Sequence, residues 1–84
     1  MIKILYFAQF RENLKCESEI YTLLEAKLTV AKLMQQLSDR GGIWLDVFGS
    51  KRKVLIAVNQ EMAKPETVIQ DDDEIGFFPP VTGG

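Results

Sequence analysis

The spacing of apolar and polar residues predicts two strands in the first third of the chain. Residues from Ile2 to Phe10 are rich in β-branched and aromatic side chains, and they run into the polar residues 11–13, which predicts a strand followed by a turn. A second apolar stretch extends from Glu19 to Glu25. Because the connection between the two stretches is short, we expect an antiparallel hairpin, although no Asn-Gly or Asp-Gly pair marks its turn.

The strongest helix signal extends from Thr29 to about Arg40. Thr29 is a good N-cap residue, and Gly41 and Gly42 stand where glycines commonly follow the last turn of a helix. Between these ends one face is apolar at the helical spacing i, i+3, i+4 and i+7, formed by Val30, Leu33, Met34 and Leu37. The pattern predicts one main helix after the hairpin.

The second half of the chain contains two further strand signals. Val54 to Asn59 is an almost continuous apolar run, which is typical of a strand buried on both faces. Residues 59–61 form a turn signal, and the acidic turn at residues 71–73 precedes the last predicted strand, Glu74 to Phe78. The segment from Ile43 to Ser50 fits either a short helical turn or a packed loop.

The predicted order of two strands, a helix and two more strands indicates an α+β domain. We expect a mixed four- to five-stranded sheet with one main helix packed on one face, which is the arrangement of a ubiquitin-like β-grasp. A split ferredoxin-like fold would need a second helix, and residues 43–50 are barely long enough to supply one. The domain is expected to cover residues 1–80, with residues 81–84 as a flexible tail.

A sheet covered by one helix has a buried face and an open face, and alternation along the strands separates the two. Lys3 marks one side of the first strand as open, and Leu5 and Phe7 share that side. In the last strand Phe78 is on the open side, and Met62 lies nearby if the turn before it folds back. The sequence therefore predicts that large apolar side chains remain on the open face.

An apolar patch of this kind on a small domain usually marks a surface that binds a partner. The alternative is that Trp44 and Phe48 fold over the patch and cover it, which would make it part of the core.

The chain ends in two prolines, a valine, a threonine and two glycines. Pro79 and Pro80 cannot donate backbone hydrogen bonds, so they end the strand, and they favour a stiff extended lead-in. The residues from Pro80 onward reach roughly 17 Å when extended. Gly83 and Gly84 have no Cβ, so they can enter a channel that a side chain would block. The alternative is an ordinary frayed terminus.

Length, charge and cysteine content restrict the class of protein. The chain has 84 residues, which suits one domain, and its net charge of -2 argues against a nucleic-acid binder. The one basic cluster, Lys51-Arg52-Lys53, is either a solvated loop or a docking patch for an acidic partner surface. No stretch reaches the ~20 apolar residues that span a membrane, and no signal-peptide pattern is present. With one cysteine, these features predict a cytoplasmic protein.

Within the chain we find no group of residues suited to catalysis or metal binding. There is no histidine, and Cys16, without a histidine to activate it, is expected to be a structural or surface thiol rather than a nucleophile. The acidic residues Asp71, Asp72, Asp73 and Glu74 lack the ligand spacing of a calcium loop. They are either a polar turn or a docking site for basic residues of an activating enzyme. We expect no metal and no cofactor bound to this chain.

The C-terminal carboxylate of Gly84 is the remaining candidate for chemistry. A carboxylate is a poor electrophile, so it must be activated from outside, with ATP converting it into a mixed anhydride with AMP. A sulfur donor can then displace AMP and leave a thiocarboxylate. On this hypothesis the protein carries one sulfur atom.

Four motifs together resemble the small subunit of molybdopterin synthase. They are the opening from Ile2 to Ala8, the Val58-Asn59-Gln60 turn, the acidic residues 71–74, and the ending Phe-Phe-Pro-Pro-Val-Thr-Gly-Gly at residues 77–84. The motifs lie in order across the whole chain, and the ending is far more specific than two glycines alone. The segment from Gly41 to Lys53 matches no motif of that family.

The resemblance implies a ubiquitin-like β-grasp and a heterotetramer built on a dimer of large subunits. It implies adenylation by an enzyme related to those that activate ubiquitin, followed by thiocarboxylation of Gly84, with Gly83 as its unhindered neighbour. Sulfur would pass to cyclic pyranopterin monophosphate (precursor Z) in the large subunit, forming the dithiolene of molybdopterin. The implied subunit interface includes Phe7, Met62 and Phe78. With the open-face and tail residues, the predicted interface is Leu5, Phe7, Met62, Phe78, Pro79, Pro80, Val81 and Thr82.

Other functions remain open from the sequence. A carrier for thiamin thiazole formation or tRNA thiolation would use the same chemistry, but the Pro-Pro-Val-Thr lead-in suits such carriers less well. A ubiquitin-like protein modifier and a non-catalytic β-grasp binding module are the alternatives from other classes.

Overall fold

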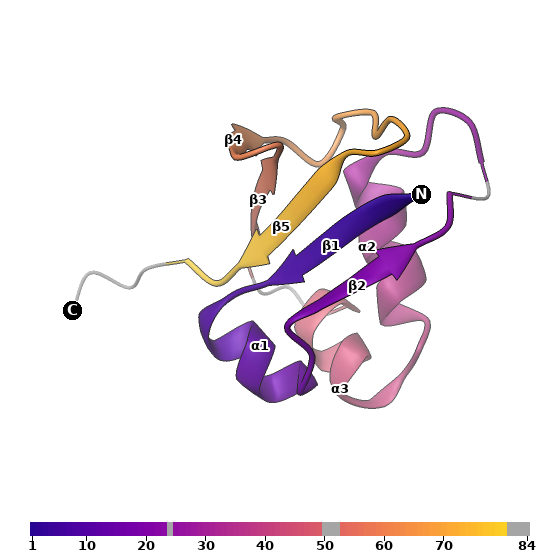
Figure 1. The fold of residues 1–84 in the computed structure, drawn as a ribbon. Helices are drawn as coiled ribbons and strands as arrows, with labels where there is room; N and C mark the ends of the chain where they lie inside the picture. The colour runs from indigo at the N-terminus through magenta and orange to yellow at the C-terminus, as the bar shows by residue number, and fades with distance from the viewer. Residues whose placement is uncertain (24, 50–52, 81–84) are drawn as a thin grey trace.

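The computed structural model describes residues 1–23, 25–49 and 53–80. Within them, five strands form one mixed sheet in the order β2-β1-β5-β3-β4, with β1 parallel to β5 and the other neighbours antiparallel (Figure 1). The strands are β1 (Ile2–Tyr6), β2 (Ser18–Tyr21), β3 (Leu55–Val58), β4 (Glu61–Ala63) and β5 (Glu74–Phe78). The mixed sheet confirms the predicted α+β class, and β5 has the predicted bounds.

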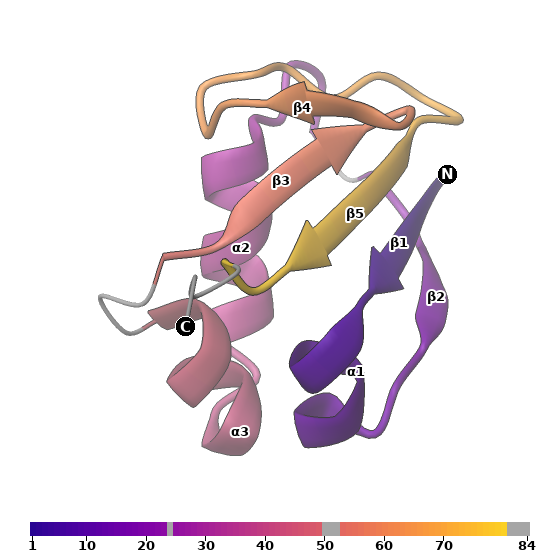
Figure 2. The same cartoon turned by 90° about the vertical axis from the view of Figure 1, so that its left-hand side faces the viewer.

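The main helix, α2 (Val30–Ser38), crosses one face of the sheet (Figure 2). It begins as the sequence predicts, because the Thr29 hydroxyl accepts a hydrogen bond from the backbone N–H of Lys32 at 3.2 Å. The helix ends one turn before Gly41, which has a φ of 78°. That left-handed conformation favours glycine and directs the chain away from the helix axis.

A second helix, α1 (Ala8–Leu14), occupies residues that the sequence pattern assigned to the first strand and the following turn. The prediction of a strand from Ile2 to Phe10 is therefore wrong beyond Tyr6. The chain turns at Ala8, which has a φ of 52°, and Phe10 and Leu14 then face the core one helical turn apart. The antiparallel pairing of β1 with β2 is confirmed, but a helix joins them in place of a short hairpin turn.

Two other segments differ in detail from the prediction. β2 ends at Tyr21, so the predicted strand from Glu19 to Glu25 is too long at its C-terminal end. The ambiguous segment after Gly41 is helical, with a short α3 (Gly42–Trp44) followed by a π-helical turn, η1 (Leu45–Gly49). Its last residue, Ser50, lies outside the described residues.

The core fills the space between the sheet and the helices. Ile2, Ile4, Tyr6, Ile75 and Phe77 are each no more than 1% exposed, which confirms the predicted buried face of β1 and β5. The apolar stripe of α2 is buried in the same cluster, and burial of this apolar surface as a whole stabilises the domain.

The turn between β3 and β4 contains a residue that is poorly suited to its backbone. Asn59 and Gln60 have φ values of 52° and 70°, as in the tight hairpin turns that prefer Asn-Gly. Because a residue with a Cβ is strained there, Gln60→Gly should stabilise the domain by about 1 kcal/mol. Thermal unfolding should show a midpoint about 4–8 °C higher. Gln60→Ala, which keeps the Cβ, is the control and should give no such gain.

Candidate functional site

Across the open face of the sheet, four residues from four strands lie side by side. Leu5 of β1 pairs with Gly76 of β5, Gly76 pairs with Ala57 of β3, and Ala57 pairs with Met62 of β4. Residues paired across neighbouring strands project on the same side of a sheet. Met62, which the sequence could place only conditionally, is thus on the same face as Leu5, and its side chain is 65% exposed.

Phe7 and Phe78 add two aromatic rings to this row. Phe7 is 43% exposed, and its ring meets the ring of Phe78 edge-on with centroids 6.1 Å apart. Phe7 also lies over Gly76, where an added Cβ would be 3.0 Å from the Phe7 ring. Leu5, Phe7, Ala57, Met62 and Phe78 are called the open face from here on.

Trp44 and Phe48 do not cover the open face. The Trp44 ring packs edge-on against Tyr6 at 5.4 Å between centroids, and the Phe48 ring packs against Phe77 at 5.1 Å. Because Tyr6 and Phe77 project from the opposite, buried side of the sheet, the alternative of a covered patch is wrong.

The open face extends further than the sequence pattern indicated. Ile20 of β2 pairs with Lys3 and is exposed, and Leu55 of β3 pairs with Phe78. Neither residue could be assigned to this face from the sequence, because each assignment depends on which strand is the neighbour and in which register. Alternation within β3 puts Leu55 and Ala57 on the same side of the strand, but it does not tell whether that side is the buried face or the open face of the sheet.

The tail begins at one end of the open face. β5 ends at Phe78, and Pro79 and Pro80 follow it with half-buried side chains. The predicted site residues Val81, Thr82, Gly83 and Gly84 lie outside the described residues. Their roles stay predictions, and so does the division of the chain at residue 80.

The acidic turn before β5 makes several bonds within the protein. Asp71 pairs with the N-terminal amine of Met1. Asp73 accepts a hydrogen bond from the side-chain amide of Asn59 at 3.0 Å, and the backbone N–H of Glu74 donates to Asn59 at 3.0 Å. These contacts support the interpretation of a structural polar turn, and a docking role for Asp71 to Glu74 stays a prediction.

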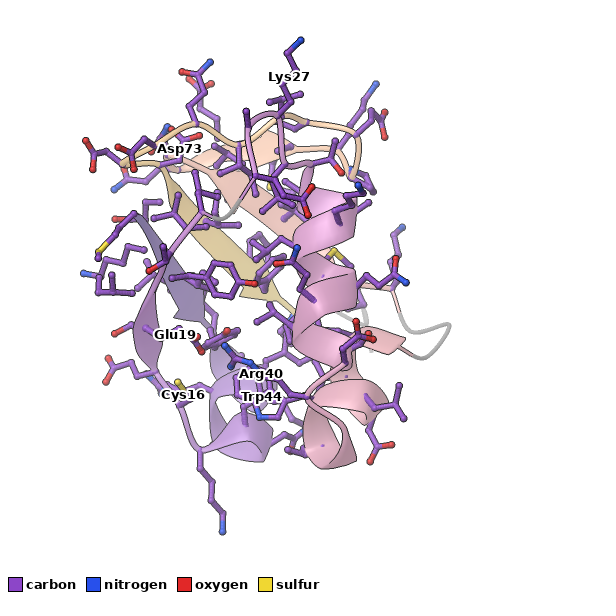
Figure 3. All side chains as sticks on the ribbon, turned by 90° about the vertical axis from the view of Figure 1, so that its right-hand side faces the viewer. Cys16, Glu19, Lys27, Arg40, Trp44 and Asp73 are labelled. Carbon is purple, nitrogen blue, oxygen red and sulfur yellow. The ribbon has the colours of Figure 1, made fainter. Side chains whose placement is uncertain are left out.

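A charged cluster on the side of the sheet opposite the open face joins β2 to the C-terminal end of α2 (Figure 3). Arg40 donates two hydrogen bonds to the Glu19 carboxylate, at 2.6 and 3.0 Å, and its guanidinium lies 4.4 Å above the Trp44 ring. The Tyr6 hydroxyl donates to the same carboxylate at 3.0 Å. These hydrogen bonds link β1, β2 and the segment after α2, which indicates a structural role for the cluster.

The pKa shifts of the groups in and beside this cluster agree with a structural role. The hydrogen bond from Arg40 lowers the pKa of Glu19, so its carboxylate stays charged. Burial, reinforced by the charge of Glu19, raises the pKa of Tyr6 far above its ordinary range. Burial and the same negative charge raise the pKa of Cys16, whose thiol lies 3.5 Å from the carbonyl oxygen of Ser18. Cys16 therefore stays protonated and is a poor nucleophile, as the sequence predicts.

The Glu19–Arg40 pair should make stability depend on acid pH. Because the pKa of Glu19 is lowered in the fold, its contribution is complete above about pH 4.3, the ordinary pKa of a glutamate. It is lost as the pH falls through the lowered pKa. Glu19→Gln should lower the free energy of unfolding by about 1 kcal/mol at pH 7. In acid, the free energy of unfolding of this variant should depend less on pH than that of the unmodified chain.

Urea unfolding of both proteins between neutral and acid pH measures this difference. Glu66→Gln, which changes an exposed carboxylate elsewhere on the surface, is the matched control and should follow the unmodified chain. Equal loss of stability in acid for Glu19→Gln and the unmodified chain would contradict the assignment.

Among the described residues we find no cluster of three or more metal-ligating side chains. In that same part of the chain, no helix is long and apolar enough to cross a membrane.

The sheet order, the helix across one face and the solved structures with the same arrangement define the fold as a ubiquitin-like β-grasp. A putative molybdopterin converting factor subunit 1 from Pyrococcus furiosus superposes with a TM-score of 0.75 at 28% identity, over 95% of this chain and 97% of that one. A chain in the protein-protein complex of subunits 1 and 2 of molybdopterin-converting factor from Helicobacter pylori has a TM-score of 0.61 at 23% identity, over 99% of this chain and 97% of that one. At that identity the likeness shows the fold alone.

Sequence comparison gives the family. The family model described as the ThiS family matches residues 4–84, so the chain belongs to the ThiS family. Along its whole length the chain also resembles molybdopterin synthase sulfur carrier subunits. It is 36% identical to that of Haemophilus influenzae over 84 residues and 38% identical to that of Escherichia coli over 85 residues, with 100% of both chains covered in each case. These relatives confirm the resemblance noted from the four motifs.

Proposed function

We propose that this chain is the sulfur-carrying small subunit of a molybdopterin synthase and that Gly84 carries the sulfur. The observation that supports this most strongly is an exposed apolar face from whose edge Pro79 and Pro80 lead into a Gly-Gly sequence ending, in a chain whose full-length relatives are sulfur carrier subunits. The open face would bind the large subunit and the tail would enter its active site.

The chemistry takes place in two stages. In the first, an activating enzyme related to those of ubiquitin uses ATP to form an acyl adenylate on the Gly84 carboxylate, and pyrophosphate leaves. A sulfur donor then attacks the acyl carbon, AMP leaves, and a thiocarboxylate remains. In the second stage the thiocarboxylate sulfur is transferred to cyclic pyranopterin monophosphate and the Gly84 carboxylate is restored. Two such transfers, each from one thiocarboxylated chain, supply the two sulfur atoms of the molybdopterin dithiolene.

The residues of this chain deliver the reactive group and do not perform the chemistry. Within the described part of the chain, the thiol of Cys16 and the phenol of Tyr6 are both held protonated, and Tyr6 is buried. The catalytic pocket would therefore belong to the large subunit. Pro79 and Pro80 would keep the lead-in extended, and Gly83 would leave room around the acyl carbon during both stages.

The acidic turn is the candidate for recognition by the activating enzyme. Asp72 is exposed, and the described contacts of its neighbours keep the turn in one conformation. Basic residues of an enzyme could approach this turn while the open face is occupied, because the turn precedes β5 whereas Pro79 and Pro80 follow the other end of that strand.

Intact-mass spectrometry tests the proposal against its alternatives. The chain is incubated with its activating enzyme, ATP and a sulfur donor. A mass gain equal to the replacement of one oxygen by sulfur is the expected result. An isopeptide bond from Gly84 to lysines of other proteins would instead identify a protein modifier, and an unchanged mass would favour a non-catalytic binding module.

A further inference from the structure

A groove lies beside the point where the tail leaves the domain. Its volume is about 380 Å³, and its lining comes from α1, from the approach to β3 and from the residues that follow β5. Its lining consists of Gln9, Phe10, Asn13, Lys53, Pro79 and Pro80. This volume lies within the roughly 300–1,000 Å³ of ligand pockets in proteins, so the groove is large enough to hold a few residues of an extended segment.

The lining combines an apolar floor with polar groups of a particular kind. Gln9 and Asn13 are four residues apart on α1, so both amides project from one face of the helix. Each amide can donate and accept, and together they can bond the N–H and C=O of an extended backbone. Pro79 and Pro80 supply apolar contact without a backbone N–H, and Lys53 supplies a positive charge.

We propose that this groove binds an extended segment of the large subunit and that an acidic side chain of that segment pairs with Lys53. The inference rests on the proposed function, because it requires a partner on the open face. Phe7 leads directly into α1 and Phe78 leads directly into Pro79, so the segments that line the groove begin where the open face ends. A partner that covers the open face and also encloses the tail must pass over the groove.

The charge of the groove favours an acidic segment. Lys53 belongs to the one basic cluster of a chain whose net charge is -2, and it is exposed. No ion pair to Lys53 is found among the described residues. A positive charge at the rim of an apolar surface selects partners and orients them as they approach. For Lys53 the inference favours the docking role that the sequence left open, whereas Lys51 and Arg52 lie outside the described residues.

Binding of the large subunit from the same organism to charge variants of the full chain tests this inference. Lys53→Glu should weaken binding by about ten-fold and reduce its dependence on salt, whereas Lys53→Arg should bind normally. Lys27→Glu is the matched control, since Lys27 lies at the opposite end of the molecule from α1 and should not matter (Figure 3). Equal affinity of Lys53→Glu and Lys27→Glu would overturn the inference.

Zero-length crosslinking of the complex with a carbodiimide gives an independent test. We expect an amide bond between Lys53 and an aspartate or glutamate of the large subunit, identified by mass spectrometry of the digest. A bond from Lys53 to the carboxylate of Gly84 in the free chain would assign the groove to the chain's own tail and overturn the proposal.

The proposed function and the groove can fail separately. If Phe7→Asp loses affinity while Lys53→Glu retains it, the interface stands and the groove proposal fails. If the unmodified chain does not bind the large subunit, the proposed function fails and the groove proposal fails with it.

Discussion

Deletion of Gly84 is expected to abolish sulfur transfer while leaving the domain folded. The new terminal carboxylate, on Gly83, would end about 3.4 Å short of the original position. Misplacement of a reacting group by 1 Å can cost about 100-fold in rate, so the loss should be at least that large. The rate of dithiolene formation, measured with the large subunit and precursor Z, gives the result.

Two controls separate loss of reach from loss of fold. The thermal unfolding midpoint should be unchanged, because the deleted residue lies beyond the last strand and the core. Gly84→Ala keeps the length of the tail and should lose less activity than the deletion, since it adds only a methyl group. A deleted chain that transferred sulfur at the normal rate would contradict every role assigned to the tail.

Replacement of Phe7 by aspartate is expected to produce the second large effect. Phe7 lies between Gly76 and Phe78 in the open face and is 43% exposed, so a partner there would bury its ring. Aromatic residues at the centre of an interface commonly contribute 2 kcal/mol or more, which corresponds to about 30-fold in affinity. Burying an unpaired carboxylate adds to that loss. Calorimetric titration with the large subunit measures it.

The matched control is Val68→Asp, because Val68 is similarly exposed but lies outside the open face. It should bind the large subunit with normal affinity. Phe7→Asp should retain the circular dichroism and unfolding transition of the unmodified domain. Unfolding of the free variant would instead show that Phe7 belongs to the core, and the open face would then lose its assignment as an interface.

Local signals predicted those parts of the fold that depend on neighbouring residues. The start of α2 follows from the Thr29 cap, and its apolar stripe follows from the 3.6-residue repeat. The helix α1 was missed because it is short. Its two buried residues, Phe10 and Leu14, are too few to establish a helical repeat, while Phe7 and Phe10 prolonged the apolar run of β1.

Part of the candidate site could also be predicted from local sequence. Alternation around Lys3 was enough to place Leu5 and Phe7 on the open face, and the same rule placed Phe78. Ala57 and Ile20 could not be placed, because their face depends on pairing with strands distant in the sequence. The groove is still less accessible to sequence reasoning, since three separate segments form it.

The Glu19–Arg40 pair illustrates the same limit for electrostatics. The two residues are 21 positions apart, and nothing in their local sequence marks either as a partner. Only the packing of β2 beside the end of α2 brings the carboxylate to the guanidinium. The sequence therefore contained no sign of this partly exposed ion pair, which links the edge strand β2 to the segment after α2.

The most direct test of the account follows one sulfur atom on this chain. Thiocarboxylated protein is mixed with the large subunit and precursor Z, and its intact mass is recorded over time beside dithiolene formation. We expect the added mass to be lost from Gly84 in step with the appearance of dithiolene. Dithiolene formation while the added mass remains on the chain, or loss of the mass without any product, would contradict it.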